Sequence, residues 1–255
     1  MATDFGLDGA LAVVVGASEG IGAVIAEGLA EAGAAVVLGG RFEERLAGTA
    51  QAVEDRGGSA HIQTVDVRDA DDVKRFAREV INEVGVPTVL VNSMGGQLMK
   101  QAMDVEVDEW DLIHETHLRG TFLVCQAFGI AMSEQGYGKV INLSSTYSQT
   151  VVQGRSTYSA AKAGISQLTA ALALEWGPSG VRVNALAPGT TRTPRVERRL
   201  EADSALEEQM TKSIPLGRIA EPRDMVGPAI FLSSRMSDFV TGQTLIVDGG
   251  WARSK

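Results

Sequence analysis

Three polar side chains in the second half of the chain have the types and spacing that proton transfer needs. Tyr158 and Lys162 are four residues apart in a segment of helical periodicity, so they should lie one turn apart on the same helix face. A tyrosine titrates at about 10, and a neighbouring ammonium lowers that pKa because it stabilises the tyrosinate. Ser145 follows an apolar run, where its hydroxyl could donate a hydrogen bond to a substrate oxygen. The pattern predicts a general acid with a supporting hydroxyl, and the alternative is a Tyr/Lys pair on the surface.

A glycine-rich turn near the N-terminus has the features of a phosphate-binding site. The sequence from Gly16 to Gly22 follows an apolar run and opens a segment with helical spacing, in the pattern G-x-x-x-G-x-G. Glycines in such a turn let backbone N–H groups and the positive end of a helix approach a pyrophosphate closely. Plain tight turns also use glycine, so the strand and helix around the turn are stronger evidence than the spacing alone. We expect a bound dinucleotide here, held by Gly16, Ser18, Glu19, Gly20, Ile21 and Gly22.

The elements that would position these groups alternate between strands and helices. Apolar residues at helical spacing between Val73 and Val84 form the clearest amphipathic helix. Alternation of this kind predicts an α/β fold, a doubly wound Rossmann-type parallel sheet with helices on both faces. The seven strand candidates are residues 11–15, 35–38, 61–65, 88–91, 140–143, 181–186 and 245–247. We expect one domain over residues 1–255, in which the segment 189–215 covers the substrate.

The composition of the chain excludes several classes of protein. Its 255 residues are 44% apolar and 22% charged, an ordinary globular balance. A net charge of −9 argues against a protein that binds nucleic acid or an anionic membrane surface. The chain has no run of about 18 apolar residues and carries Asp4 and Asp8 where a signal peptide would be basic. Its one cysteine, Cys125, provides no second thiol for zinc or a disulfide, so we expect a cytoplasmic protein with no metal.

Two predicted helices are apolar on nearly all sides. They are residues 122–132 and 160–176, whereas a surface helix is usually apolar along one stripe. A sheet covers one side of such a helix, so the other side needs a second partner. We expect a homotetramer, in which these helices form one interface and the last strand forms another. Burial by other segments of the same chain is the alternative.

Several motifs together resemble the short-chain dehydrogenase/reductase family, and the resemblance covers essentially the whole chain. The glycine turn resembles the family's T-G-x-x-x-G-x-G, with Val15 at the threonine position, and residues 92–95 resemble its N-N-A-G. Tyr158 and Lys162 match the family's Y-x-x-x-K, with Ser145 standing 13 residues upstream. Further matches are Pro188, Gly189, Thr193 and the chain end at residues 242–250.

The resemblance implies hydride transfer between a nicotinamide and a carbonyl or alcohol carbon of a small molecule. Tyr158 would give or take the hydroxyl proton, Ser145 would orient the substrate oxygen, and Lys162 would also hold the nicotinamide ribose. The implied cofactor contacts further include Asp66, Val67, Asn92, Pro188, Gly189, Thr191 and Thr193. The whole pattern is most similar to 3-oxoacyl-acyl-carrier-protein reductases and gluconate-type (sugar-acid) dehydrogenases.

The residues after the second strand bear on the choice of cofactor. An acidic residue there accepts from the ribose 2′-hydroxyl of NAD, whereas an arginine suits the 2′-phosphate of NADP. The chain has Gly40 at the position where NAD-using relatives carry aspartate, followed by Arg41. Glu19 argues against NADP, because that position in the glycine turn is often basic in enzymes that use it. We expect NADP, with NAD as the alternative.

One position departs from the family pattern in a way that affects the proton path. The sequence His117-Leu118-Arg119-Gly120 resembles the family's N-L-x-G, so His117 replaces an asparagine that helps to hold a water linked to the lysine. Histidine can donate and accept hydrogen bonds and titrates at about 6.5. If a neutral ring serves the relay, turnover should fall as the pH drops through about 6 to 7. A core histidine is the alternative, and this departure also favours a catalytically silent NADP(H)-binding sensor or scaffold.

Loops should form the walls around the substrate. The candidates are residues 93–104, residues 146–155 and the stretch after Gly189. The last of these holds a basic cluster on an acidic protein, formed by Arg192, Arg195, Arg198 and Arg199. Such a cluster could receive a carboxylate, a phosphate or a carrier-borne acyl group. Local pairing with Glu197 and Glu201 on a solvated face is the alternative.

Overall fold

The protein is built around a seven-stranded sheet in which all neighbouring strands run parallel. The computed structural model describes residues 7–203 and 205–254. The strands are β1 (Leu11–Val15), β2 (Ala35–Gly40), β3 (Ala60–Thr64), β4 (Val89–Asn92), β5 (Gly138–Leu143), β6 (Val181–Pro188) and β7 (Thr244–Val247). Their order is β3-β2-β1-β4-β5-β6-β7, so the chain order reverses between β1 and β4. The predicted doubly wound Rossmann-type α/β fold is confirmed, and no predicted strand end is wrong by more than two residues.

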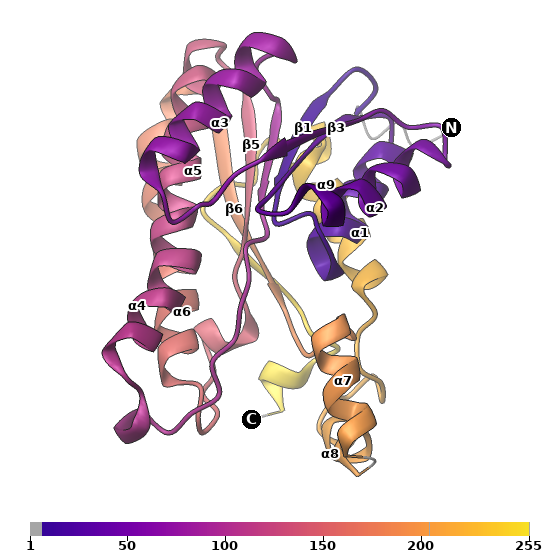
Figure 1. Cartoon of the computed structure of the whole chain (residues 1–255), viewed down its shortest axis with the longest axis vertical. Helices are drawn as coiled ribbons and strands as arrows, with labels where there is room; N and C mark the ends of the chain where they lie inside the picture. Colours follow the sequence, from indigo (N-terminus) through magenta and orange to yellow (C-terminus); the bar gives the residue numbers. More distant parts are fainter. Residues whose placement is uncertain (1–6, 204, 255) are drawn as a thin grey trace.

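Helices cover both faces of the sheet, as Figure 1 shows. On one face lie α1 (Gly20–Glu31), α2 (Glu43–Glu54) and α9 (Val226–Ser233), and on the other lie α3 (Ala70–Glu83), α4 (Val107–His114), α5 (Gly120–Glu134) and α6 (Ser156–Trp176). The remaining helices, α7 (Pro194–Ala202) and α8 (Leu206–Lys212), extend past one end of the sheet. A π-helical turn spans residues 115–119, and 3-10 turns span 102–104, 146–148, 177–179, 222–225, 235–237 and 251–253. Among these described elements, no helix is long and apolar enough to cross a membrane.

The core has two halves because successive strand residues point to opposite faces of the sheet. In β1, Val14 packs in the half beside α1 and α9, whereas Val13 packs in the half beside α3, α5 and α6. Phe76 and Phe128 meet edge to face in the second half, with ring centroids 5.6 Å apart, an arrangement that adds about 1 kcal/mol to their burial. A third, smaller cluster joins Val196 and Leu200 of α7 to Ile214 and Ile219 and holds α7 in place.

Polar side chains tie the centre of the sheet together. Asn92 at the end of β4 donates from Nδ2 to Asn142 Oδ1 at 2.9 Å and to Cys125 Sγ at 3.2 Å. Asn142 in turn donates from Nδ2 to Thr169 Oγ1 at 3.0 Å. Cys125 is a fully buried free thiol, and burial raises its pKa to about 12, so it belongs to the core. This network links β4 and β5 to α5 and α6, the elements that carry the site described next.

Candidate active site

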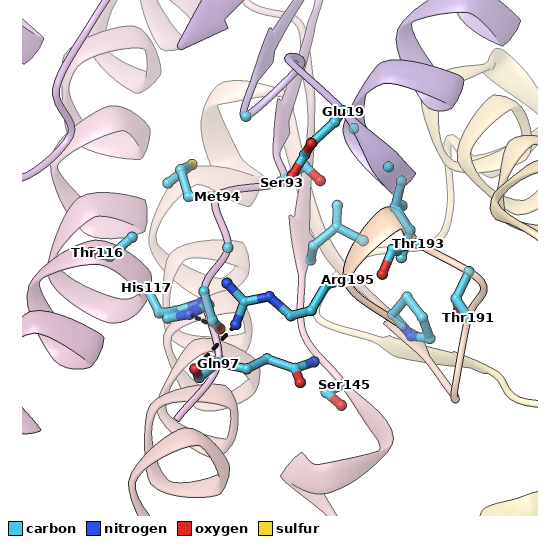
Figure 2. A pocket seen from close by; sticks show the side chains of 18 of the residues that line it. Glu19, Ser93, Met94, Gln97, Thr116, His117, Ser145, Thr191, Thr193 and Arg195 are labelled. Carbon is cyan, nitrogen blue, oxygen red and sulfur yellow. Dashed lines mark hydrogen bonds between the residues drawn. The ribbon is translucent and has the colours of Figure 1, made fainter. Parts of the chain in front are cut away.

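A cleft of about 440 Å³ opens at the carboxyl ends of the strands, where parallel α/β sheets bind ligands. Its wall combines the glycine turn, the ends of β2, β4, β5 and β6, the start of α6 and the start of α7. Figure 2 shows how side chains from these separate segments converge on it. The lining includes seven Lys and Arg residues but only two acids, Glu19 and Asp66, although the whole chain is acidic. The cleft therefore suits an anionic ligand.

The glycine turn packs closely against the backbone around it and lies at the cleft. Gly16 has a φ of +88°, and a Cβ there would lie 2.6 Å from the carbonyl carbon of Ser93. A Cβ on Gly22 would lie 2.2 Å from the carbonyl oxygen of Gly16. No other residue type fits these two positions, and helix α1 begins at Gly20 with its positive end at the cleft. All six residues predicted for this turn line the cleft, so the turn fits a dinucleotide pyrophosphate.

Ser145, Tyr158 and Lys162 come together on the cleft wall as predicted. Ser145 lies two residues after the end of β5, and its Oγ accepts a hydrogen bond from the backbone N of Tyr147 at 3.2 Å. Tyr158 and Lys162 occupy the first two turns of α6. The ammonium of Lys162 donates to the backbone O of Leu143 at 2.6 Å and lies 5.6 Å from the centre of the Tyr158 ring. The end of β5 thus fixes the ammonium of Lys162 near the ring of Tyr158.

Burial controls the ionisation of this group. It raises the pKa of Tyr158 to about 12, although a hydrogen bond with Ser145 acts in the opposite direction. Burial also lowers the pKa of Lys162 to about 7. The expectation that Lys162 would lower the pKa of Tyr158 is therefore wrong for this structure, because both side chains are more than nine-tenths buried and loss of hydration outweighs the nearby charge. Tyr158 keeps its proton at neutral pH, as a general acid must.

His117 lies beside Tyr158 in the π-helical turn between α4 and α5. The two rings meet edge to face with centroids 5.4 Å apart, and His117 is 1% exposed. Its Nε2 is 2.9 Å from the backbone O of Gly96, which can only accept, so Nε2 carries the hydrogen. The other nitrogen, Nδ1, is then an acceptor, and it is buried with no hydrogen-bond partner among the described residues.

The pKa of His117 is far below that of an ordinary histidine. Burial and, next, the charge of Lys162 lower it to about 3. The expected fall of turnover between about pH 6 and 7 through protonation of His117 is therefore wrong for this structure, because the imidazole stays neutral through that range. A neutral acceptor is still what a proton relay would use.

The far end of the cleft is basic and carries an aromatic ring. Arg41 and Arg45 both place their guanidinium carbon 5.3 Å from the centre of the Phe42 ring, and all three residues line the cleft. Asp66 forms an ion pair with Arg68 at 2.7 Å, and the hydrogen bond from Arg68 holds the pKa of Asp66 below its usual value. At this end of the cleft, Arg41, Arg45 and Arg68 outnumber the acids. The excess of positive charge suits the 2′-phosphate on the adenosine ribose of NADP.

Four predicted residues at the end of β6 and just after it form another part of the wall. Pro188, Gly189, Thr191 and Thr193 all line the cleft, and Thr191 Oγ1 donates to the backbone O of Gly189 at 3.1 Å. Figure 2 shows Thr191 and Thr193 on the segment that leads into α7. A Cβ on Gly20 would lie 3.4 Å from Thr193 Cγ2, so this wall approaches the glycine turn closely.

Asn92 is the one predicted cofactor contact that lies outside the cleft. Its side chain turns into the sheet centre toward Asn142 and Cys125 and does not line the cavity. Gln97, Tyr147 and Arg155 line the cleft from the segments 93–104 and 146–155, which were predicted to form its walls, whereas Phe42 and Arg45 were not singled out from the sequence. Arg45 lies in the first turn of α2, four residues after Arg41, so its nearness in the sequence to a predicted residue was the available signal.

Comparison with known proteins gives matches over nearly the whole chain. Residues 16–252 match the family model described as enoyl-(acyl carrier protein) reductase. The chain is 39% identical to gluconate 5-dehydrogenase of Gluconobacter oxydans and 38% identical to D-threitol dehydrogenase of Mycolicibacterium smegmatis. The first match covers 96% of both chains, and the second covers 97% of this chain and 95% of the relative.

The structure is also similar to that of gluconate 5-dehydrogenase from Burkholderia cenocepacia in complex with NADP and tartrate. The two share a TM-score of 0.94 and 37% identity, with 98% of each chain covered. These matches agree with the glycine turn and with the assembled Ser145, Tyr158 and Lys162. The chain belongs to the short-chain dehydrogenase/reductase family, and it is an NAD(P)-dependent oxidoreductase that acts on CH–OH and C=O groups.

Proposed function

We propose that the protein interconverts a secondary alcohol and a ketone of a small hydroxylated molecule, using NADP(H), through Ser145, Tyr158 and Lys162. The observation that carries this proposal is that these three side chains line one cleft with the glycine turn and the basic pocket around Arg41. The comparisons add relatives named for sugar acids and polyols. Residues 189–215 are proposed to cover the substrate, since α7 contributes to the cleft wall.

Each residue has a defined task in the proposed reaction. When NADP(H) is bound, its nicotinamide supplies or accepts the hydride. Tyr158 gives its hydroxyl proton to the substrate oxygen during reduction and takes that proton back during oxidation. Ser145 donates a hydrogen bond to the same oxygen and stabilises the charge that develops on it. Lys162, held by the backbone O of Leu143, is placed to donate to a ribose hydroxyl and to return a proton to Tyr158.

His117 is proposed to position the proton relay. Its Nδ1 is a buried acceptor that faces no partner among the described residues, and the charge of Lys162 is close enough to affect its pKa. A water between the two would satisfy Nδ1 and link the lysine to solvent. On this reading the neutral imidazole replaces the asparagine of the family pattern in accepting a hydrogen bond.

The cofactor is proposed to be NADP, with the 2′-phosphate held by Arg41 and Arg45. Both guanidinium groups lie over Phe42 at the cleft end, and Gly40 leaves no carboxylate to repel a phosphate. Among the described acids, Glu19 also lines this end and opposes the preference. Gluconate 5-dehydrogenase of Burkholderia cenocepacia, similar in structure, was crystallised with NADP.

The test of the proposed function uses wild-type protein with each cofactor and a panel of ketones and secondary alcohols. Turnover is followed by the absorbance of reduced nicotinamide, and cofactor binding is measured separately by calorimetry. Turnover of at least one substrate, with NADP(H) bound more tightly than NAD(H), supports the proposal. Tight cofactor binding without any turnover would favour a sensor or scaffold instead. Failure to bind either cofactor would contradict both the proposed enzyme and the sensor or scaffold.

A homotetramer is proposed from apolar side chains that the chain leaves exposed on two regions. Phe122 and Ile130 on α5 and Leu174 on α6 are exposed although these helices are apolar on nearly all sides. Phe239, five residues before β7, is fully exposed. Two separate apolar regions support two interfaces, as a tetramer with two-fold axes requires.

A cytoplasmic location is also proposed. The single cysteine, Cys125, is a buried free thiol, which suits a reducing compartment. Fractionation of cells that express the protein from its own gene, followed by detection with an antibody, tests this location.

A further inference from the structure

Three arginines line the part of the cleft beside Tyr158. Arg155 immediately precedes α6 and is only 6% exposed, although arginine is one of the residue types least often buried. Arg195 and Arg199 are four residues apart on α7, so they lie on one face of that helix, and both line the cleft. The two helices therefore bring three positive charges to the same wall.

Neutral groups are the hydrogen-bond partners of Arg155 and Arg195. Arg155 donates from Nη1 to the side-chain Oε1 of Gln97 at 3.0 Å, and Arg195 donates from Nη1 to the backbone O of Gln97 at 3.1 Å. Figure 2 shows Arg195 reaching from α7 to Gln97. Over residues 7–203 and 205–254, none of the three arginines forms an ion pair. Their charge is thus available to a ligand.

Arg192, from the same basic segment, behaves differently. It pairs with Glu197 at 2.9 Å, with Glu221 at 3.3 Å and also with Glu207, and it does not line the cleft. Local pairing, the alternative for the whole segment, is therefore correct for Arg192 alone. Arg198 is exposed on α7 and also lies outside the cleft lining.

The unpaired charge at Arg155 carries a free-energy cost. Burial lowers the pKa of its guanidinium, and the nearby charges of Arg199 and Arg195 act in the same direction. Arginine does not lose its proton under such conditions, so the charge persists without a counter-ion. Both acids that line the cleft lie elsewhere, Glu19 in the glycine turn and Asp66 in its pair with Arg68. An anion entering beside Tyr158 would offset this cost, whereas a neutral ligand would not.

We propose that Arg155, Arg195 and Arg199 form a subsite for a carboxylate of the substrate. The substrate is then a hydroxy acid, or the corresponding oxo acid, rather than a neutral polyol. This inference rests on the proposed function, because Tyr158 must act on the carbinol carbon of the same molecule. A guanidinium suits a carboxylate because its planar N–H groups match the two oxygens. Tyr147 lies close to both Arg155 and Tyr158. Its ring centre is 6.0 Å from Arg155 Cζ and 6.1 Å from the ring centre of Tyr158.

Gluconate and sorbitol provide the matched substrates for the test, because both carry a six-carbon hydroxylated chain and only gluconate has a carboxylate. The wild type should have a kcat/KM for gluconate that is at least about 10-fold above that for sorbitol, and only the gluconate value should fall with rising salt. In Arg155→Gln, kcat/KM for gluconate should drop about 10- to 100-fold, the size expected for loss of one charge-assisted contact. The value for sorbitol should change less than about 3-fold, since no charge on sorbitol meets the arginine.

Further variants separate a binding role from a structural one. Arg195→Gln and Arg199→Gln, on partly exposed positions of α7, should show the same selective loss and serve if Arg155→Gln does not fold. Arg155→Lys should recover part of the gluconate activity. Arg198→Gln makes the same change of charge on the same helix outside the cleft, and it should leave both substrates unaffected.

Tartrate binding to the enzyme mixed with NADP⁺, measured by calorimetry, gives a readout that does not need turnover. It should weaken in Arg155→Gln and not in Arg198→Gln. A wild type that prefers sorbitol, or an Arg155→Gln variant that loses both substrates equally, would overturn the inference. So would a strong preference for 6-phosphogluconate that Arg155→Gln abolishes, since the subsite would then take a phosphate. Cofactor binding with no turnover of any substrate would refute the proposed function, while tartrate would still test the subsite.

Discussion

Replacing His117 by asparagine should remove a pH dependence from the stability of the protein. In the folded chain the pKa of His117 is about 3, whereas in the unfolded chain a histidine titrates at about 6.5. As the pH falls below about 6.5, the unfolded state binds a proton that the folded state does not bind until about pH 3. The wild type therefore loses stability through this window as the pH decreases, and a variant with an uncharged amide does not lose this contribution.

The size of the effect follows from the separation of the two pKa values. Within the window, the free energy of unfolding of the wild type falls by at most about 1.4 kcal/mol for each pH unit. Integration from about pH 7.5 to about pH 5 gives a total loss of roughly 2 kcal/mol. As the pH falls from about 7.5 to about 5, the free energy of unfolding of His117→Asn minus that of the wild type should rise by this amount. The absolute difference at pH 7.5 also contains the change in packing and hydrogen bonding, so only its variation with pH is diagnostic.

Urea unfolding of both proteins at a fixed concentration, at several pH values, measures this difference. His114→Asn is the matched control, because it makes the same change at a half-buried histidine one turn away from His117, and it shows how much of the variation with pH is specific to position 117. A His117→Asn difference that stays constant within about 0.5 kcal/mol would refute the reasoning, since it would mean that the buried imidazole titrates normally. In the same samples, turnover per folded enzyme should show no inflection from His117 near neutral pH. His117→Ala should lose more turnover than His117→Asn, because alanine provides no acceptor.

Three further predictions concern the reaction, the cofactor and the assembly. Tyr158→Phe should keep the fold and NADP binding but lower turnover by about 100-fold or more, measured under conditions where chemistry limits the rate; retention of half the turnover would exclude Tyr158 as general acid. The wild type should bind NADPH more tightly than NADH. Gly40→Asp combined with Arg41→Ala should shift this preference toward NADH, because the change removes a partner of the 2′-phosphate and adds a carboxylate that repels it. Calorimetric titration with both cofactors measures the preference, and equal binding by the wild type would contradict the assignment to NADP. Sedimentation at micromolar concentration should show an assembly of four chains. Phe122→Glu should reduce this assembly to two chains, because it places a charge in one of the two interfaces. A monomeric wild type would contradict the tetramer and leave the exposed apolar residues of α5 and α6 without a role.

The sequence was sufficient for the features that depend on neighbouring residues in the chain. The strand runs and the helix around Val73 were predictable because burial imposes a short period on apolar residues. The glycine turn was predictable because its glycines, strand and helix are contiguous, and the same holds for Tyr158 and Lys162 on one helix face. The motif around Asn92 correctly indicated a strand end. It did not reveal that the side chain points into the sheet, because that depends on partners 33 and 50 residues away.

The ionisation of the site could not be predicted in the same way. The spacing of Tyr158 and Lys162 predicts their proximity, but the direction of each pKa shift depends on how completely other segments bury them. The ammonium of Lys162 finds its partner in the backbone of Leu143, on a strand that precedes it by 19 residues. For His117, the π-helical turn and the carbonyl of Gly96 determine which nitrogen is left as a free acceptor. Each of these facts is a property of the assembled fold.

The arginines show most clearly why substrate selectivity was hidden in the sequence. Four of them between residues 192 and 199 form an apparent unit, but the acids that pair with Arg192 include Glu207 and Glu221, which only the folded segment brings within reach. Arg192 is thus paired outside the pocket, while Arg155, some 40 residues earlier in the chain, lines the cleft together with Arg195 and Arg199. In a chain of net charge −9, a pocket keeps a positive potential only if acids are absent from its wall. The lining around Tyr158 meets this condition among the described residues, so the placement of acids elsewhere is as much a part of the proposed carboxylate selectivity as the arginines are.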